Sequence, residues 1–478
     1  MKSHSESKAP KISVKLLLKA LCYISPLLLW MFSSTLFSGV FSIVEQRMLV
    51  VLLFAVVYWI LEPVPVFATS VAIIFVLVAI LSDTALLPFL NHGQENFGKL
   101  VPYKELFHSF ASPVIMLFLG GFFLSGASSK YGLDKNLARV FLKPFGSSVE
   151  TVMLGAMLIT AFFSLWMANT PVTAMMLAIC APIIGLFPAA DPGRAAFLLS
   201  IPMASTIGGI GTPVGTPANA VAMKYLTGDS AVSFSEWMLL GVPYVIVMVL
   251  ASWWIIKKLL PSELREVNID LSGSFDKSTK AKIVYLVFPL TLALWLTSQW
   301  HGLNIYSVSL FPVAAFVVTG VINKNDLKKM SWDVLWLIAG GIALGVALEG
   351  TGLTHTLVGL IPFGTFSPAL LIISATLVTV SIATIMSHTA TANLLIPIVA
   401  AVGAQSSLLA QMGGSRILIG CVAVASSLGM ALPISTPCNA LAYAAGGVSN
   451  QQMMKVGLTL SVLGVALLLG VMLLLAGA

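Results

Sequence analysis

Long apolar stretches separated by short polar connections recur along the chain from residue 17 to the C-terminus. A helix needs about 20 apolar residues to cross the hydrocarbon core of a bilayer. By that measure the sequence predicts eleven crossings, near residues 17–37, 47–62, 64–82, 110–128, 196–226, 237–257, 282–300, 304–321, 332–349, 415–444 and 455–477. The pattern is that of an all-α polytopic membrane protein with the lipid bilayer as its environment.

Two further apolar stretches, 150–187 and 368–403, are too long for one straight crossing. Their central polar residues are Asn169 and Thr170 in the first stretch and Ser387, His388 and Thr389 in the second. Each stretch also follows a short loop, so we expect each to enter and leave on the same side of the membrane. The sequence therefore predicts two re-entrant hairpins with polar tips.

The composition excludes most other classes of protein. Hydrophobic residues make up 58% of the 478 residues and charged residues only 9%, whereas soluble proteins have about 25% charged residues. A water-facing surface cannot be built from so few charges, and the mean hydropathy of +0.99 excludes a disordered chain. The net charge of +7 therefore carries information through its placement along the chain and does not indicate a nucleic-acid partner.

The positions of the cations predict the orientation of the chain in the membrane. With the N-terminus in the cytoplasm, 20 of the 25 Lys and Arg residues fall on the cytoplasmic side of the predicted crossings, as the positive-inside rule expects. The five on the outer side are Arg47, Lys99, Lys104, Lys224 and Arg416. We therefore expect a cytoplasmic segment at 1–16, a retained first span within 17–44, a cytoplasmic linker at 258–281 and an external C-terminus.

Several motifs recur in the same order about 220 residues apart. The recurring pairs are Gly120-Gly121 with Gly340-Gly341, Gly132-Leu133 with Gly352-Leu353, Asn169-Thr170 with His388-Thr389, Thr216-Pro217 with Thr436-Pro437, and Asn219-Ala220 with Asn439-Ala440. The predicted crossings between equivalent motifs number five, and an odd number inverts the second copy. The sequence thus predicts two inverted repeats, 45–257 with the hairpin 150–187 and 282–478 with the hairpin 368–403. Inverted repeats with interrupted helices are typical of secondary transporters.

Thr-Pro steps interrupt a predicted span in each repeat, at Thr216-Pro217 and at Thr436-Pro437. Proline removes a backbone donor, and the carbonyls that it frees need partners inside a membrane. Freed carbonyls and Ser, Thr or Asn oxygens suit a small cation such as Na⁺, and the N-termini of half-helices can hold an anion. One predicted half-site combines Asn169, Thr170, Gly215, Thr216 and Pro217, and the other combines Ser387, His388, Thr389, Ser435, Thr436 and Pro437.

The motifs resemble those of the divalent anion:sodium symporter (DASS) family. The resemblance covers residue 45 to the end and is carried by residues 110–124, by Trp166-Met167-Ala168-Asn169-Thr170 and by residues 432–440. It implies transport of dicarboxylates, tricarboxylates or sulfate, Na⁺ as coupling ion, a homodimer and an elevator-type transport domain. It also implies two sodium sites, with ligands from Ser164, Ala168, Asn169 and Gly215 in the first and from Met386, His388 and Ser435 in the second.

Both hairpin tips depart from the family's Ser-Asn-Thr signature. Ala168 replaces the serine of the first tip, and His388 replaces the asparagine of the second. In the family the tip asparagine helps to coordinate sodium and contacts a substrate carboxylate. The second sodium site and the coupling ion therefore stay open. His388 is equally compatible with a neutral hydrogen-bonding role and with a role in proton or substrate handling.

The sequence favours a secondary active importer of small divalent anions, most simply C4-dicarboxylates such as succinate, malate or fumarate, coupled to sodium. A sodium-independent dicarboxylate or tricarboxylate exchanger and a sulfate transporter are the alternatives on the same scaffold. An intramembrane enzyme is disfavoured, because the chain has neither an H-E-x-x-H motif nor paired carboxylates in its predicted spans. Paired half-sites also favour an occluding carrier over a channel. We expect no organic cofactor, and a location in a bacterial inner membrane.

Overall fold

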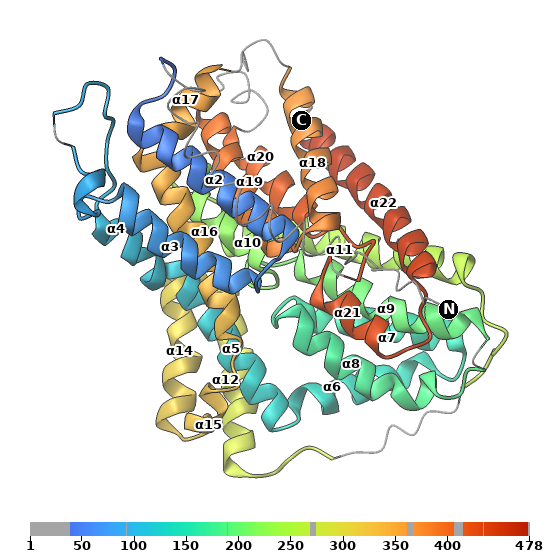
Figure 1. Ribbon diagram of the computed structural model, residues 1–478. Helices are drawn as coiled ribbons and strands as arrows, with labels where there is room; N and C mark the ends of the chain where they lie inside the picture. The colour runs from blue at the N-terminus through green and yellow to red at the C-terminus, as the bar shows by residue number, and fades with distance from the viewer. Residues whose placement is uncertain are drawn as a thin grey trace, which may run out of the picture.

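The computed structural model describes residues 39–91, 93–188, 190–267, 274–360, 367–405, 414–433 and 435–476. The predicted cytoplasmic segment 1–16 and the first span at 17–37 lie outside these residues. The described part of the chain is a helical bundle, in agreement with the all-α polytopic fold expected from the sequence. Figure 1 shows the course of the chain through this bundle.

The helices before and after residue 270 follow one another in a matching order. The first series is α2 (Ile43–Leu61), α3 (Val66–Leu81), α4 (Tyr103–His108), α5 (Pro113–Lys130), α6 (Leu133–Leu142), α7 (Val149–Ser164), α8 (Asn169–Ile184), α9 (Pro192–Gly209), α10 (Pro217–Tyr225) and α11 (Phe234–Leu259). The second series is α12 (Thr279–Leu296), α13 (Ser298–His301), α14 (Ile305–Val318), α15 (Lys324–Leu327), α16 (Trp332–Gly350), α17 (Leu353–Leu360), α18 (Pro368–Ile385), α19 (His388–Gln405), α20 (Ser415–Ser426), α21 (Pro437–Ala444) and α22 (Asn450–Ala476). From α5 and from α16 onward the two series correspond helix by helix.

Six helical segments within the described residues are long and apolar enough to cross a membrane. They are Tyr103–Lys130, Phe234–Leu259, Thr279–Leu296, Trp332–Gly350, Pro368–Ile385 and Asn450–Met472. Several other apolar helices are shorter, and among them Val149–Ser164, Asn169–Ile184 and His388–Ala404 begin or end at a predicted hairpin tip. The total of eleven crossings stays a prediction.

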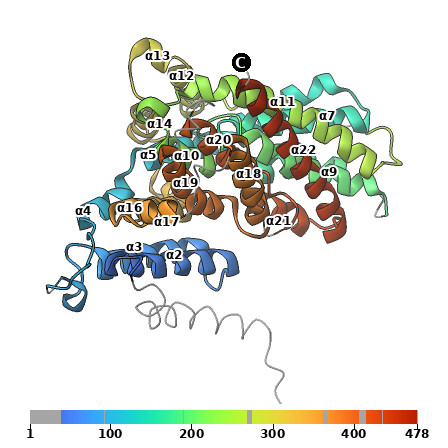
Figure 2. The same cartoon turned by 90° about the horizontal axis from the view of Figure 1, so that it is seen from above.

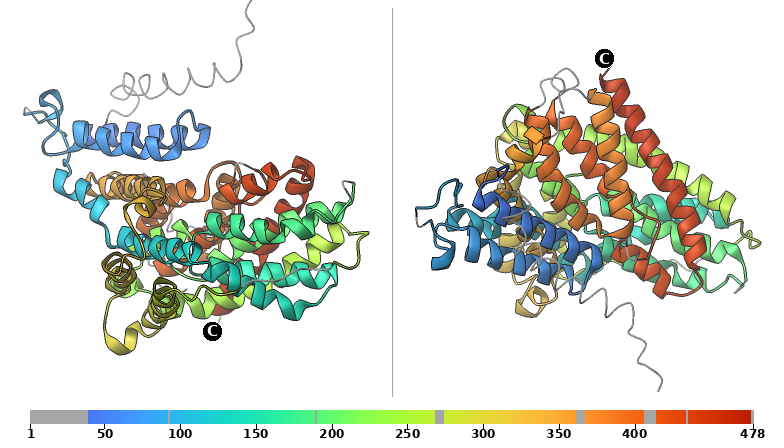
Figure 3. Two further views of the ribbon diagram at one scale, coloured as in Figure 1. Left: turned by 90° about the horizontal axis from the view of Figure 1, so that it is seen from below. Right: turned by 45° about the horizontal axis from the view of Figure 1, so that its top comes forward.

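The two series pack against each other through small residues. Helix α5 packs on α14, and α16 packs on α3. A side chain at Gly120 would clash with the backbone of Ser309, and one at Gly340 would clash with Ser70. Close approach of helices at glycine is the usual packing mode in membranes, where lipid tails are as apolar as leucine. Helices α2 and α3 thereby form an outer layer beside α16 and α17, as Figure 2 and the left view of Figure 3 show.

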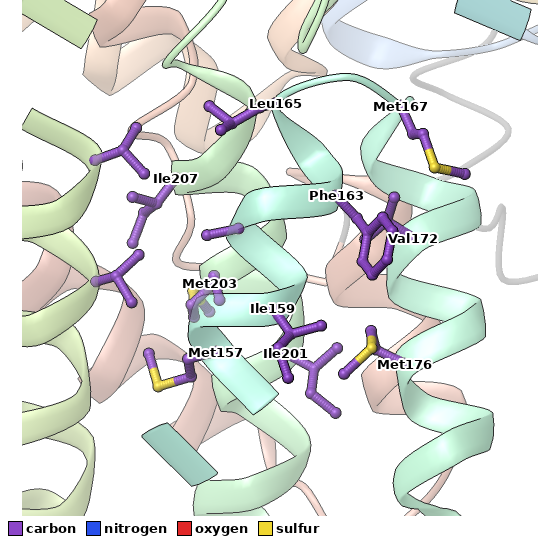
Figure 4. Close-up of a cluster of buried hydrophobic side chains, with 14 of the residues drawn as sticks. Met157, Ile159, Phe163, Leu165, Met167, Val172, Met176, Ile201, Met203 and Ile207 are labelled. Atoms are coloured by element: carbon purple, nitrogen blue, oxygen red, sulfur yellow. The ribbon is translucent and has the colours of Figure 1, made fainter. Parts of the chain in front are cut away.

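The hairpin of α7 and α8 is held by a buried apolar cluster that it shares with α9 (Figure 4). Phe163 and Met167 lie near the turn of the hairpin, and Met176 lies farther along α8 (Figure 4). These side chains are almost fully buried, as are Ile201 and Met203 of α9. Dense packing of this kind leaves the hairpin tip in one position relative to α9.

Candidate ion and anion site

Both predicted hairpin tips lie at the start of a helix. Residues 165–168 connect α7 to α8, which begins at Asn169. Met386 and Ser387 connect α18 to α19, which begins at His388. The polar residues that interrupt each apolar stretch therefore occupy the first turn of a helix, where backbone N–H groups lack intrahelical partners.

The two Thr-Pro steps interrupt their helices as the sequence predicts. Helix α9 ends at Gly209 and α10 begins at Pro217, while α20 ends at Ser426 and α21 begins at Pro437. The hydroxyl of Thr216 caps α10 by accepting a hydrogen bond from the Asn219 N–H (3.4 Å). Thr436 caps α21 in the same way through the Asn439 N–H (3.0 Å). The threonine hydroxyl accepts one of the backbone N–H groups that lack a partner at the start of the helix. Proline in the first turn has no N–H group that would need a partner.

A pair of asparagines satisfies the carbonyl groups that the breaks set free. The Asn219 side-chain amide donates to the carbonyl oxygens of Gly209 (3.1 Å), Ile210 (3.1 Å) and Thr212 (2.8 Å). The Asn439 amide donates to those of Met430 (2.9 Å) and Leu432 (3.0 Å), which lie 220 residues after Ile210 and Thr212. Both asparagines are fully buried. The repeated motif thus has a repeated structural role, which the sequence alone did not reveal.

Replacing Asn219 or Asn439 with alanine should destabilise the protein, because each change leaves carbonyls of a helix break without their side-chain donor. Each buried polar group without a partner costs about 1–3 kcal/mol. We expect a clear fall in the thermal unfolding temperature of the detergent-solubilised protein for both variants. Asn325→Ala, at an exposed position, is the control and should leave that temperature unchanged. Equal temperatures for all three variants and the wild-type protein would contradict the assigned role.

In the first half-site, hydroxyl and amide oxygens gather around Asn169. Its side-chain Oδ1 accepts a hydrogen bond from Ser164 Oγ (2.6 Å). Its main-chain carbonyl oxygen accepts one from Ser205 Oγ (2.9 Å). The hydroxyls of Ser164 and Ser205 lie 3.2 Å apart. The Thr212 hydroxyl donates to the Leu165 carbonyl, which ties the broken helix to the hairpin.

Two glycines allow the hairpin and the broken helix to meet. A Cβ atom on Gly209 would clash with Asn169 Oδ1 and with the Thr216 side chain. A Cβ atom on Gly215 would clash with the carbonyl oxygens of Gly209 and Ser164. The structure therefore brings the predicted ligands Ser164, Asn169 and Gly215 together.

The second half-site has the same architecture but different chemistry. His388 lies where the repeat has Asn169, and its Nε2 is 2.7 Å from the Gly429 carbonyl oxygen. Since a carbonyl only accepts, Nε2 carries the proton. Ser435 Oγ donates to the Thr384 carbonyl (2.6 Å), and the Ser387 hydroxyl accepts from the Ala390 N–H (3.3 Å). The imidazole thus supplies a donor here, where Asn169 supplies an acceptor oxygen.

The two half-sites are interleaved. The Thr170 hydroxyl oxygen of the first tip lies 4.0 Å from Cys438 Sγ in α21, and α21 packs on both α8 and α9. Conversely, α10 of the first repeat packs on α19, and Ala218 and Ala392 belong to one buried cluster of these helices. The N-termini of α8, α10, α19 and α21 therefore lie around one polar region. Helix N-termini carry partial positive charge and free N–H groups, so this region favours an anion.

The burial of the predicted residues divides them into two groups. The residues of the two tips are all half-buried: Ala168, Asn169, Thr170, Ser387, His388 and Thr389. The predicted sodium ligands that lie farther from the tips are buried, and they are Ser164, Gly215, Met386 and Ser435. Thr216 and Thr436 are buried as well. Pro217 is half-buried and Pro437 is exposed. The tips are thus accessible to a solute, while the deeper oxygens are shielded from solvent.

A cavity of about 410 Å³ reaches the first tip from the end of α5. Ala168 and Pro171 line it, as do Lys130 and Asp326. These two residues form an ion pair of 2.6 Å. Burial raises the pKa of Asp326, but hydrogen bonds from Lys130 and from the Asn323 N–H outweigh this effect and hold it below its usual range. The cavity thus extends to Ala168 and Pro171, the two residues that flank Asn169 and Thr170 in the chain.

Two residues of the site escaped the sequence analysis. Ser205 is one of three hydroxyl residues in the apolar helix α9, and the equivalent position of the second repeat is Ala425, so the repeat does not mark it. Cys438 is the second of these residues, and it is the point where the second broken helix meets Thr170. Its position directly after Thr436 and Pro437 was the available signal.

Paired hairpins and paired broken helices that meet at one polar region define a membrane transporter. A family model described as "Citrate transporter" (CitMHS) matches residues 56–413. The chain therefore belongs to the citrate transporter family, and its resemblance to the divalent anion:sodium symporters is confirmed. Its matched relatives are transporters and not enzymes.

The chain is also similar to individual transporters. It is 27% identical to the sodium-dependent dicarboxylate transporter SdcS of Staphylococcus saprophyticus, over 95% of this chain and 89% of SdcS. Among solved structures, it resembles the YdaH transporter of Alcanivorax borkumensis with a TM-score of 0.55 and 16% identity, over 85% of this chain and 98% of YdaH. It also resembles MtrF of Neisseria gonorrhoeae with a TM-score of 0.50 and 12% identity, over 86% and 94% of the two chains. At these identities the two structures support the fold alone.

Proposed function

We propose that the protein imports small divalent anions, with C4-dicarboxylates such as succinate, malate and fumarate as preferred substrates, and couples this import to Na⁺. The interleaving of the two half-sites, marked by the contact of Thr170 with Cys438, is the observation that carries the proposal. It gathers four helix N-termini around the two tips, and these can hold carboxylate groups without a lysine or arginine. Similarity to a sodium-dependent dicarboxylate transporter supports this choice of substrate and ion.

The first half-site is the stronger candidate for a sodium site. Ser164 Oγ and Asn169 Oδ1 are hard oxygen atoms of the kind that bind small cations, and the nearby backbone at Gly215 adds a third source of oxygen. The buried Oδ1 atoms of Asn219 in the first break and of Asn439 in the second accept no hydrogen bond from the described part of the protein, so they do not distinguish the half-sites. In the second half-site His388 replaces the amide oxygen, so Met386 and Ser435 would contribute to a weaker site.

The transport cycle that we propose follows from the matching helix series. Residues 45–257 and 282–478 would form two inverted repeats on either side of a cytoplasmic linker at 258–281. The hairpins and broken helices would move together, as an elevator, against a scaffold that includes α3, α5, α14 and α16. We further propose a homodimer in a bacterial inner membrane, with a cytoplasmic N-terminus and an external C-terminus.

One observation favours a second function. Because His388 Nε2 donates to the Gly429 carbonyl, the second tip offers no amide oxygen to a cation. A sodium-independent exchanger of dicarboxylates or tricarboxylates on the same scaffold would need no such oxygen. This alternative predicts counterflow that ignores Na⁺.

Uptake of radiolabelled succinate into proteoliposomes tests the proposal. With an inward Na⁺ gradient we expect accumulation about tenfold above that with K⁺ in place of Na⁺, because coupling to the gradient drives the anion uphill. Unlabelled succinate should compete, and sulfate and citrate serve as competitors that define selectivity. Uptake that is independent of Na⁺ but requires an internal anion would support the exchanger. The absence of transport of all three anions would exclude both the symporter and the exchanger.

A further inference from the structure

A second cavity, of about 590 Å³, lies between α10, α16, α17, α19 and α20, away from the hairpin tips. Among the residues that line it are Lys224, Tyr225, Gly345, Glu349, His355 and Pro397. The positive-inside analysis of the sequence assigns Lys224 to the outer side of the membrane. The cavity therefore lies toward the side from which an importer receives its substrate.

Lys224 is a half-buried cation that makes no salt bridge within the described residues, although Glu349 of the same cavity attracts its charge at longer range. Its Nζ atom lies 3.4 Å from the Ile342 carbonyl oxygen and 5.0 Å from the centre of the Tyr225 ring. No carboxylate in the described part of the chain lies within 4.0 Å of it, since the ion pairs there join Lys130 to Asp326 and Lys257 to Glu150. A charge that is removed from water without a partner is unfavourable, and ionisable groups in membrane segments commonly mark functional sites.

Tyr225 adds a hydrogen-bond donor beside this charge. Its hydroxyl is buried and makes no hydrogen bond within the described residues. The hydroxyl lies directly over Gly345 of α16, where any larger side chain would overlap it. An ammonium group and an unpartnered phenolic donor on neighbouring residues are both groups that hydrogen-bond carboxylate oxygens.

The other titratable groups that line this cavity are Glu349 and His355, and both are exposed. The Glu349 carboxylate opposes an incoming anion, whereas Lys224 attracts it. These two residues should therefore influence anion binding with opposite signs.

The cavity also matches the one that reaches the first tip. That cavity borders Ser125 and Ser129 of α5, and this one borders Gly345 and Glu349, which lie 220 residues later in α16. Its wall continues along α19, the helix that begins with the second tip at His388. The two cavities thus flank corresponding helices of the two series.

We propose that Lys224 and the Tyr225 hydroxyl form an outer anion subsite, which takes one carboxylate group of a small dianion before the dianion reaches the hairpin tips. The subsite rests on the proposed function, because it deepens the route by which that substrate enters. It raises the local concentration of the anion at the tips, so its loss affects apparent affinity more than maximal rate.

Succinate uptake into proteoliposomes at about pH 7 tests the subsite. Lys224→Gln should raise the KM for succinate about tenfold and leave the maximal rate within about twofold. Tyr225→Phe should raise the KM about threefold, and Glu349→Gln should lower it about threefold, because a repelling charge is removed. Lys224→Arg, which keeps the charge, should restore most of the affinity. Lys99→Gln removes an exposed cation from the same predicted side and should leave the KM unchanged.

A KM for Lys224→Gln equal to that of the wild-type protein would overturn the subsite, as would equal increases for Lys224→Gln and Lys99→Gln. If Lys224→Gln does not fold, Glu349→Gln and Tyr225→Phe decide, and an unchanged KM in both overturns it. Failure of the proposed function is distinct, because the wild-type protein would then show no succinate uptake at all.

Discussion

Asn169→Ala is expected to reduce Na⁺-driven succinate uptake at least about tenfold and to raise the Na⁺ concentration for half-maximal uptake. Asn169 Oδ1 is the amide oxygen of the proposed first sodium site, and Ser164 Oγ holds it in place across 2.6 Å. Alanine removes this oxygen and leaves the Ser164 hydroxyl with only Ser205 nearby. Loss of a ligand or of the group that orients it commonly weakens metal binding 10–100-fold. The measurement is initial uptake in proteoliposomes over a series of Na⁺ concentrations.

Thr170→Ala separates the ion from the substrate at the same tip. Thr170 faces Cys438 across the interleaved half-sites, so its loss should raise the KM for succinate more than the half-saturating Na⁺ concentration. Asn325→Ala, at an exposed position, is the control for both variants. Transport by both tip variants at the wild-type level, in protein that elutes as a single folded species, would remove the first half-site from the mechanism.

Much of the fold could be predicted because length and polarity constrain a membrane helix so strongly. Polar residues in the middle of an apolar stretch demand a local interruption, and this reasoning located the starts of α8 and α19. Proline at positions 217 and 437 likewise located the starts of α10 and α21. In each case one backbone rule, the need to satisfy polar groups inside a membrane, was sufficient.

The contacts between the repeats could not be predicted, because they depend on how helices distant in sequence pack. Nothing in the sequence near Gly340 indicates that Ser70 is its neighbour, and the same holds for Gly120 and Ser309. Ser205 lacked a repeat counterpart, and the several carbonyls that Asn219 satisfies become visible only when the break is folded. The internal repeat therefore identifies residues that have the same role in both halves of the sequence. It does not identify a residue such as Ser205, which only one half contains.

The difference between the two tips has the largest consequence for coupling. His388 occupies the position of Asn169 in the repeat, yet its Nε2–H donates to Gly429 where Asn169 Oδ1 accepts from Ser164. His388→Asn should therefore preserve succinate transport and lower the half-saturating Na⁺ concentration, by up to about tenfold. An amide supplies an oxygen that can coordinate a cation, which a protonated Nε2 cannot do. A tenfold gain corresponds to about 1.4 kcal/mol, which is within the range of one added ligand.

His301→Asn is the matched control for this substitution. His301 is exposed, and its Nε2 lies 2.8 Å from the Leu294 carbonyl oxygen, so it makes a similar contact outside the site. Its replacement should leave the response to Na⁺ unchanged. If His388 instead carries a proton during transport, His388→Asn will abolish the pH dependence of uptake relative to the wild-type protein and leave the Na⁺ response unaltered. Measuring uptake over a grid of pH and Na⁺ concentrations separates the two roles, because a ligand role changes the response along the Na⁺ axis and a proton role changes it along the pH axis.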